Sequence, residues 1–169
     1  MIKMHTLLTE ITLDGVTPYA TQFAWRKAGE WRETEFQADG ITITLSMVPE
    51  PHNEWSFAIL TPTADGQGHT VAHSRSAAVG QVSYLRLMAT VAEALLDFAT
   101  QWQPAAIDVT GSDTASTAKD LQKTRIYRSL LHANAVKLSR IGYTVLDRSG
   151  KLYIVRKTRA DSTGVAEQS

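Results

Sequence analysis

A short apolar stretch, AAIDVTG at residues 105–111, lies between two helical patterns and limits the topologies open to this chain. A strand that is reached through a helix returns to its sheet by a crossover, which sets it parallel to an earlier strand. The simplest earlier neighbour is EWSFAIL at residues 54–60. We therefore expect one parallel pair, between residues 105–110 and residues 55–60, inside a mostly antiparallel sheet.

The part of the chain before residue 61 shows the two-residue period of β-strands. In ITITLSM, residues 41–47, large apolar side chains alternate with Thr and Ser, so we expect one buried and one exposed face. Asp39-Gly40 in front of this stretch indicates a tight turn. Further strands of an antiparallel meander are predicted at residues 7–13, 19–25, 31–36 and 54–60. The second and third of these are expected to form a hairpin.

The pattern then changes from strands to helices. Residues 62–80 are rich in small and polar side chains and predict a long loop, a feature that is often functional or mobile. Residues 82–102 carry apolar side chains at three- and four-residue steps, which predicts a helix that Pro104 ends. A second helix is predicted at residues 118–141, with Tyr127 facing inward.

The end of the chain completes the predicted fold. Gly142 is a natural C-cap for the second helix, and residues 143–157 predict a hairpin that turns at residues 149–150. The length of 169 residues is typical of a single domain. We predict one α+β domain, residues 1–157, with a mixed, mostly antiparallel sheet and two main helices. A weakly ordered polar tail is expected at residues 158–169.

Composition excludes several kinds of site. The chain has no cysteine, which rules out disulfides, thiolate zinc sites and a cysteine nucleophile. No window approaches the roughly 18 apolar residues of a membrane-spanning helix. The N-terminus also lacks the apolar run of a signal peptide. We therefore expect a soluble, intracellular protein without a membrane partner.

Charge is divided unevenly along the chain although the net charge is zero. Residues 1–118 hold 6 Lys and Arg against 13 Asp and Glu, whereas residues 119–169 hold 11 against 4. The basic last third is either a solvated surface balanced by the acidic part of the molecule, or a site for an anion such as a nucleotide cofactor, RNA or DNA.

Three local features accompany this order of elements. Tyr127 lies in the second predicted helix, Gly142-Tyr143 follows that helix, and the segment RSAAVG, residues 75–80, precedes the first helix. Together with the strand and helix order, they resemble the C-terminal two-thirds of the GNAT acyltransferase fold. The RxxGxG or RxxGxA loop of that family holds the pyrophosphate of coenzyme A, so the resemblance implies acetyl-CoA as the cofactor of an enzymatic member.

The resemblance also has two departures. In GNAT enzymes the loop turns backbone N–H groups and a helix N-terminus towards the pyrophosphate, and glycines permit close approach. The implied cofactor residues are Arg75, Ala78 and Gly80, but Ala78 replaces the first glycine and would crowd the pyrophosphate. The implied general acid, Tyr127, lies about four helical turns before the Gly-aromatic pair, whereas the family's tyrosine lies only a few residues before it.

A second resemblance covers about half of the chain, from VSYLRLM to KTRIYRSLL. This segment of the chain is similar to a group of small uncharacterised bacteriophage proteins. The matching residues are Thr90, Val91, Phe98, Ile107, Val109, Arg125, Tyr127 and Arg128. The resemblance implies an accessory or virion-associated protein, encoded by a phage or mobile element and present in the host cytoplasm or the virion.

Arg125 and Arg128 are candidate binding residues. They lie in the N-terminal half of the second predicted helix, where positive charge is unfavourable to the helix dipole. Two interpretations are open. The pair is balanced by Asp113 or Asp120, or it grips a phosphate or a partner carboxylate.

Histidines and tryptophans give weaker signals. His69 and His73 have the spacing of a helical metal pair, but they lie in a loop-like stretch without a zincin glutamate, so we expect no metal site. His132 is expected on a helix surface. The four tryptophans are expected in the core, although Trp31 beside Arg32 marks a binding surface in an alternative interpretation.

Three functional hypotheses follow. The first is a GNAT-like scaffold that binds a macromolecular partner, a host or virion protein, through Arg75, Arg125, Tyr127 and Arg128, without cofactor, metal or catalysis. The second is an acyl-CoA-dependent N-acyltransferase in which backbone N–H groups of residues 77–80 hold the pyrophosphate. The third is nucleic-acid binding through the basic last third, which predicts a strong dependence on salt.

Overall fold

The computed structural model describes residues 15–62, 69–71, 83–109, 118–148 and 150–158. The strands are β1 (Arg26–Ala28), β2 (Trp31–Ala38), β3 (Ile41–Glu50), β4 (Glu54–Pro62), β5 (His69–Val71), β6 (Ala106–Asp108), β7 (Tyr143–Arg148) and β8 (Lys151–Arg156). The helices are a short 3-10 turn η1 (Pro51–Asn53), α2 (Tyr84–Trp102), α3 (Ala118–Ala133) and α4 (Ala135–Arg140). No helix in the described part of the chain is long and apolar enough to cross a membrane.

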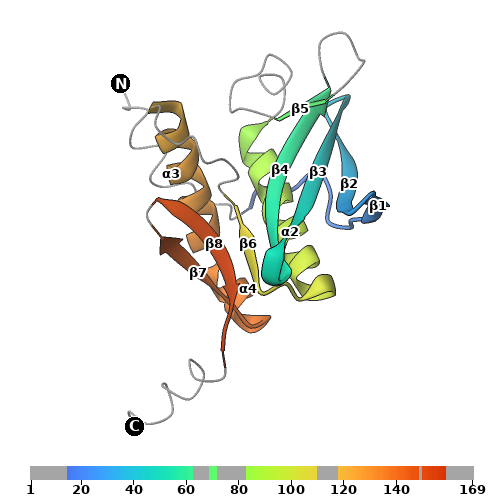
Figure 1. The fold of residues 1–169 in the computed structure, drawn as a ribbon. Coiled ribbons are helices and arrows are strands. Elements are labelled where there is room, and N and C mark those ends of the chain that lie inside the picture. Colours follow the sequence, from blue (N-terminus) through green and yellow to red (C-terminus); the bar gives the residue numbers. More distant parts are fainter. Residues whose placement is uncertain (1–14, 63–68, 72–82, 110–117, 149, 159–169) are drawn as a thin grey trace, which may run out of the picture.

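The strands form one sheet in the order β1-β2-β3-β4-β6-β8-β7, and β5 pairs with β4 outside this path (Figure 1). All neighbours are antiparallel except β4 and β6. The predicted α+β class with a mixed, mostly antiparallel sheet is therefore confirmed.

The predicted parallel pair is formed by β4 and β6. Their register joins Glu54 to Ala106, Trp55 to Ile107 and Ser56 to Asp108. Helix α2 is the crossover between the two strands, as expected for a parallel connection. The ladder covers only the beginning of the nine-residue strand β4, and beyond it the two halves of the sheet diverge (Figure 1).

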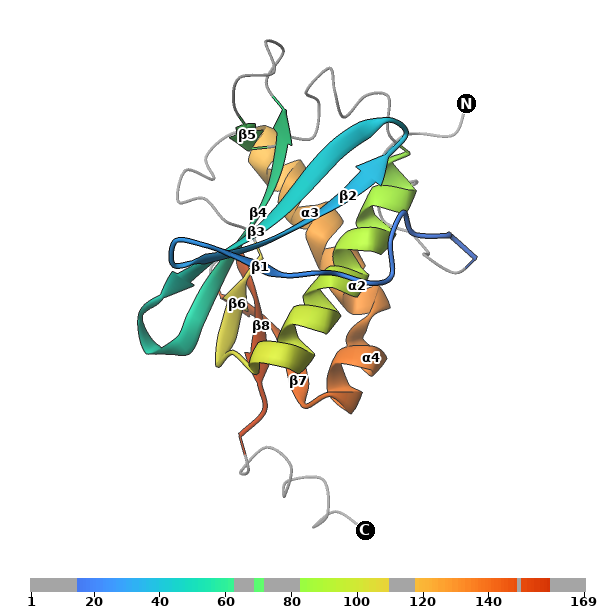
Figure 2. The same cartoon turned by 90° about the vertical axis from the view of Figure 1, so that its right-hand side faces the viewer.

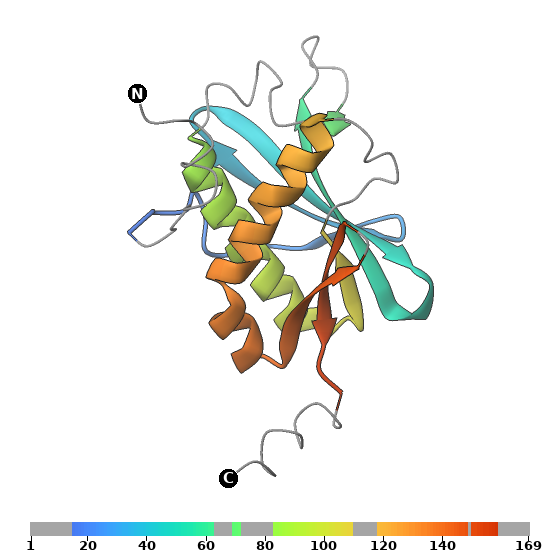
Figure 3. The same ribbon diagram turned by 90° about the vertical axis from the view of Figure 1, so that its left-hand side faces the viewer.

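Helices α2, α3 and α4 lie on the same side of the sheet (Figures 2 and 3). Burial alternates along β8 accordingly. Leu152 and Ile154 are fully buried under the helices, while Tyr153 and Val155 are half-buried on the opposite side of the sheet. The apolar face of α2 fills the same core with Leu87, Met88, Val91, Leu95 and Phe98. Each such side chain stabilises the fold by about 1.5–3 kcal/mol when it is fully buried.

The predicted strand at residues 19–25 is wrong. These residues cross α2 without strand structure (Figure 2). The backbone N–H of Tyr19 donates to Thr90 Oγ1 at 2.8 Å, and the indole of Trp25 donates to Asp97 Oδ2 at 2.8 Å. Both acceptors belong to α2, so the aromatic side chains of this stretch pack on a helix and not beside another strand. The predicted hairpin is formed by β1 and β2 alone.

The second predicted helix is divided at Asn134. Its side-chain Nδ2 donates to the Leu130 carbonyl oxygen at 2.9 Å, and its own carbonyl accepts from the N–H of Leu138 at 2.9 Å. Asparagine competes with the helical backbone for hydrogen bonds in this way, which explains the end of α3 and the start of α4.

The polar face of β3 is not exposed as predicted. Thr44 is 2% exposed and Ser46 is 0% exposed. β3 lies between β2 and β4, so longer side chains on both neighbours cover its short polar ones, and Thr44 donates to Glu35 Oε1 at 3.5 Å. The Ser46 hydroxyl has no hydrogen-bond partner among the described residues. A strand in the middle of a sheet is therefore buried more completely than its own alternation indicates.

Turn and cap predictions are confirmed. Asp39 and Gly40 both have positive φ, 50° and 84°, as a type I′ hairpin turn requires. Gly142 has φ 90° after α4, and its N–H donates to the Ser139 carbonyl oxygen at 3.1 Å. This is the αL ending that glycine permits at a helix C-terminus.

Replacing Gly142 by Ala should destabilise the protein by about 1–2 kcal/mol, because a Cβ is strained at this positive φ. Open space surrounds the position, so the loss would come from the backbone and not from a clash. Urea unfolding measures it. Gly142→Asn is the matched control and should lose less, since asparagine tolerates the αL region. An Ala variant as stable as wild type would contradict the cap.

Candidate functional site

The side of the sheet opposite the helices carries the candidate site. We call this side of β4, β6, β8 and β7 the outer face. No described helix covers it (Figures 2 and 3). The register places Ala106 beside Val155 and Leu146 beside Tyr153, so these side chains share the outer face.

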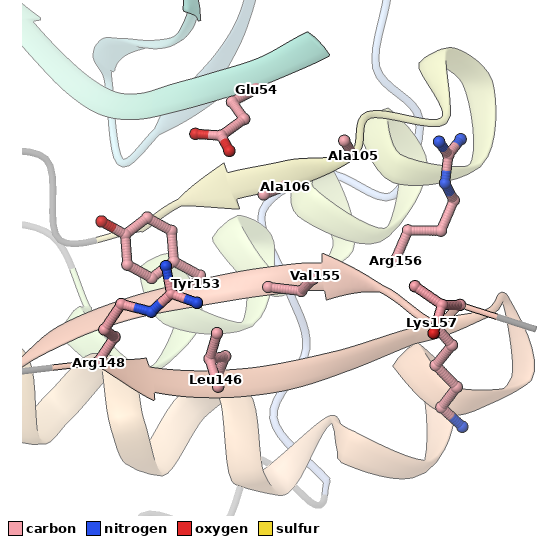
Figure 4. Close-up of a pocket in the computed structure, with 10 residues that line it drawn as sticks. Glu54, Ala105, Ala106, Leu146, Arg148, Tyr153, Val155, Arg156 and Lys157 are labelled. Atoms are coloured by element: carbon pink, nitrogen blue, oxygen red, sulfur yellow. The ribbon is translucent and has the colours of Figure 1, made fainter. Parts of the chain in front are cut away.

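A cavity of about 530 Å³ opens on the outer face (Figure 4). Its lining residues are Glu54, Ala105, Ala106, Leu146, Arg148, Tyr153, Val155, Arg156, Lys157 and Thr158. The volume lies within the range of about 300–1,000 Å³ that ligand sites occupy in proteins. The charged residues among the ten form the rim and lie at or just beyond the ends of strands, and Ala105, Ala106, Leu146 and Val155 form an apolar floor between them.

Three cations and one carboxylate belong to the rim. Arg148 lies beside Tyr153 at one end of the cavity, and Arg156 and Lys157 lie at the other end (Figure 4). Arg156 Nη1 donates to the Gln103 carbonyl oxygen at 3.0 Å. These three cations make no salt bridge with another described residue.

Lys157 is held in the same way as Arg156, by a neutral acceptor. Its Nζ lies 2.7 Å from Ser139 Oγ. Hydrogen bonds to a carbonyl or a hydroxyl orient a cation without cancelling its charge. Both acceptors belong to the helical layer, Gln103 after α2 and Ser139 on α4, so the charged ends of Arg156 and Lys157 lie at the border between the cavity and that layer. The lining of the cavity carries three positive charges, offset in part by Glu54.

The start of α2 is occupied by the chain itself. The hydroxyl of Tyr19 donates to Asp39 Oδ2 at 2.5 Å and accepts from the N–H of Ser83 at 2.9 Å. The Arg86 guanidinium lies 4.0 Å above the centre of the Tyr19 ring and donates to the Thr17 carbonyl oxygen. Desolvation and the hydrogen bond to Asp39 raise the pKa of Tyr19.

Tyr127 lies in the core and not on a surface. It is 5% exposed, and its ring packs edge-on against Phe57 with the ring centres 6.5 Å apart. Burial, with a smaller contribution from nearby Tyr84, raises the pKa of the Tyr127 phenol above its ordinary value. The inward orientation predicted from the sequence is confirmed, and this position leaves no exposed surface for a partner.

Arg125 and Arg128 have different surroundings. Arg128 Nη2 lies 2.7 Å from Asp147 Oδ2 on β7, and Arg128 Nε also donates to that oxygen at 3.2 Å. Arg125 is exposed. Asp147 thus balances Arg128, while the side chains of Asp113 and Asp120, the two aspartates expected from the sequence, lie outside the described part of the chain. Both partners of this ion pair are more than one-third exposed, so it contributes less than about 1 kcal/mol.

Several candidate residues lie outside the described part of the chain: Arg75, Ala78, Gly80, His73 and Asp113. Their predicted roles stay predictions. His132 is exposed on α3, as expected. The described residues contain no group of three His, Asp or Glu side chains able to hold a metal ion.

Trp31 is 42% exposed at the start of β2, while Trp25, Trp55 and Trp102 pack against Phe98. Core packing is therefore confirmed for three of the four tryptophans.

The cavity residues were not predicted from the sequence, although a signal was present. In KLYIVRK, residues 151–157, alternation places Lys151, Tyr153, Val155 and Lys157 on one face. Two cations flanking an aromatic residue on a strand indicate a polar, exposed sheet surface. The contributions of Ala106 and Glu54 could not be read from this stretch, because they depend on the register between strands far apart in sequence.

No family model, no curated protein and no solved structure matches this chain. The geometry of the chain itself therefore carries the functional argument.

Burial of Tyr127 predicts a specific pH dependence of stability. The folded state keeps this phenol proton above about pH 10, where the unfolded chain loses it, so stability is present below that pH and falls above it. Tyr127→Phe cannot titrate, and its stability should fall less steeply above pH 10, by up to about 1.4 kcal/mol per pH unit.

Urea unfolding between about pH 8 and pH 11 measures this difference in slope. Tyr84→Phe should show the same change, because burial also raises the pKa of Tyr84. If the Tyr127→Phe curve runs parallel to wild type through this range, the phenol is not shielded in the way the structure indicates.

Proposed function

We propose that this protein acts by binding a macromolecular partner, without catalysis, and that the binding surface is the outer-face cavity. The observation that carries this proposal is the apolar floor bordered by Arg148, Arg156 and Lys157, three cations without a salt bridge to another described residue. Such a surface attracts an anionic partner and offers it apolar contact area as well.

We propose further that the scaffold is GNAT-like and is encoded by a phage or mobile element. A β-meander, a helix, a short parallel strand, further helices and a terminal hairpin follow one another in the order that raised this resemblance. The parallel β4–β6 pair supports the same proposal. The proposed phage origin rests on the sequence resemblance around Arg125, Tyr127 and Arg128.

Two contacts favour binding over acyl transfer. The N–H of Ser83 at the start of α2 is donated to the Tyr19 hydroxyl, whereas a coenzyme A pyrophosphate would need the N–H groups of this region. Tyr127 is enclosed between the sheet and α3, with its proton held by burial. The residues that the resemblance implies for the pyrophosphate, Arg75, Ala78 and Gly80, lie outside the described part of the chain, and Ala78 in place of glycine counts against the cofactor.

The partner surface can be tested by capture from bacterial lysate with immobilised protein. Arg148→Glu combined with Lys157→Glu should lose the macromolecules that wild type retains, because both rim charges are reversed. Lys27→Glu combined with Arg140→Glu is the matched control, with the same change of net charge at exposed positions on β1 and α4. It should retain what wild type retains. Equal retention by both double variants would remove the outer face as the binding surface.

An acyl-CoA-dependent N-acyltransferase is the second candidate function, and one observation favours it. The Tyr127 ring lies against Phe57, the β4 residue that follows the last residue paired with β6. A tyrosine near the point where two parallel strands diverge is close to where the GNAT resemblance would place an acyl site.

Calorimetric titration with acetyl-CoA and desulfo-CoA separates the two functions. We expect no heat of binding at millimolar ligand, because Ala78 replaces a glycine of the pyrophosphate loop and the N–H of Ser83 is already donated to the Tyr19 hydroxyl. Micromolar binding would overturn this expectation and make acyl transfer the leading function. The variant Tyr19→Phe, which removes the hydroxyl that accepts from Ser83, shows whether that contact blocks the ligand.

A further inference from the structure

Tyr153 offers a flat aromatic surface at the Arg148 end of the cavity. It is a half-buried outward residue of β8, and Figure 4 shows its ring broadside in a view onto the outer face. Leu146, Val155 and Ala106 extend the apolar surface around the ring. An aromatic ring on an open sheet is the platform on which single-stranded nucleic acids stack their bases.

Cations lie on both sides of this ring along the strand direction. Arg148 pairs with Lys151, two positions before Tyr153 on β8, and Lys157 comes four positions after it. With a rise of about 3.3 Å per residue, these levels lie about 7 Å and 13 Å from the ring. A backbone that runs along β8 would therefore meet a positive charge on either side of a base stacked at Tyr153.

Glu54 distinguishes a nucleic acid from an acidic protein segment. Its carboxylate lines the same cavity, where the carboxylates of an acidic peptide would meet it with like charge. A base instead presents amino groups, and carboxylates accept hydrogen bonds from the cytosine N4 amino group. A second carboxylate, Asp108, is paired with Tyr153 in the register of β6 and β8 and shares the outer face with Ala106. This mixture of cations, carboxylates and an aromatic ring thus fits a nucleotide better than it fits a polyacidic peptide.

From this geometry we propose that the outer-face cavity binds single-stranded nucleic acid. One base stacks on the Tyr153 ring and donates a hydrogen bond from its amino group to the Glu54 carboxylate. The flanking phosphates bind Arg148, Arg156 and Lys157. This inference rests on the proposed binding role of the outer face. Duplexes bind more weakly, because their bases are stacked inside the helix and cannot reach the ring.

Fluorescence anisotropy with a labelled oligo-dC strand tests the proposal. Neutralising three phosphates gives a slope of about −2 for log K against log salt, since each contact on a single strand contributes about −0.7. Tyr153→Ala should weaken binding roughly 5- to 150-fold and leave this slope unchanged. Tyr153→Phe keeps the ring and is the matched control, which should bind as wild type does.

Charge and base selectivity provide independent arms of the test. Arg148→Gln should reduce the salt slope by about 0.7. Oligo-dT lacks the amino group that Glu54 accepts, so it should bind more weakly than oligo-dC, and Glu54→Gln should reduce that preference. A melting curve for each variant confirms that it is folded.

The outcomes separate this inference from the proposed function. Absence of oligo-dC binding by wild type, or full binding by folded Tyr153→Ala, overturns the nucleic-acid assignment. If lysate capture through the outer face yields nuclease-resistant protein, the proposed binding surface stands and the nucleic-acid inference falls. If reversal of Arg148 and Lys157 changes neither capture nor oligo-dC binding, both fall.

Discussion

The three-residue parallel ladder between β4 and β6 is the constraint on which the rest of the structure depends. Antiparallel neighbours can be joined by short turns, but this junction needs a crossover, and α2 supplies it. The ladder connects two antiparallel halves, β1–β4 and β6–β8–β7, that make few other connections within the sheet. Because the junction is short, the halves diverge beyond it, and α2 and α3 must fill the space behind them (Figure 1).

Placement of α2, α3 and α4 on one side leaves the outer face of the sheet to its own side chains. Apolar residues that point towards the helices, such as Leu152 and Ile154, are buried in the core. Residues of the opposite phase, such as Tyr153 and Val155, are only half covered. The cavity is therefore a consequence of the same alternation that builds the core, and its charged rim arises where β7 and β8 end and cations reach solvent.

Local signals in the sequence predicted local structure well and long-range contacts poorly. Glycine at a positive φ, as at Gly40 and Gly142, acts through its own backbone, so turns and caps could be predicted. The parallel pair followed from connectivity. By contrast, the alternating aromatic side chains of residues 19–25 pack on α2 and not in a sheet, and Arg128 forms its ion pair with a carboxylate on β7. These contacts, like the cavity, depend on which elements meet in space, and a period or a spacing does not contain that information.

The salt bridges between described residues show how the acidic first part and the basic last third of the chain are paired. If the basic last third merely balanced the acidic part, salt bridges between described residues would run between the two. A salt bridge of this kind joins Lys137 to Glu93 at 3.5 Å. Arg26 instead binds Glu33 and Glu35 within the acidic part, and Arg128 binds Asp147 within the basic part. The rim cations of the outer face make no salt bridge with a described residue, and the carboxylate in the same cavity lining is Glu54. An anionic partner gains most where the protein has not already neutralised its own cations, and the binding role that we propose for the outer face rests on this.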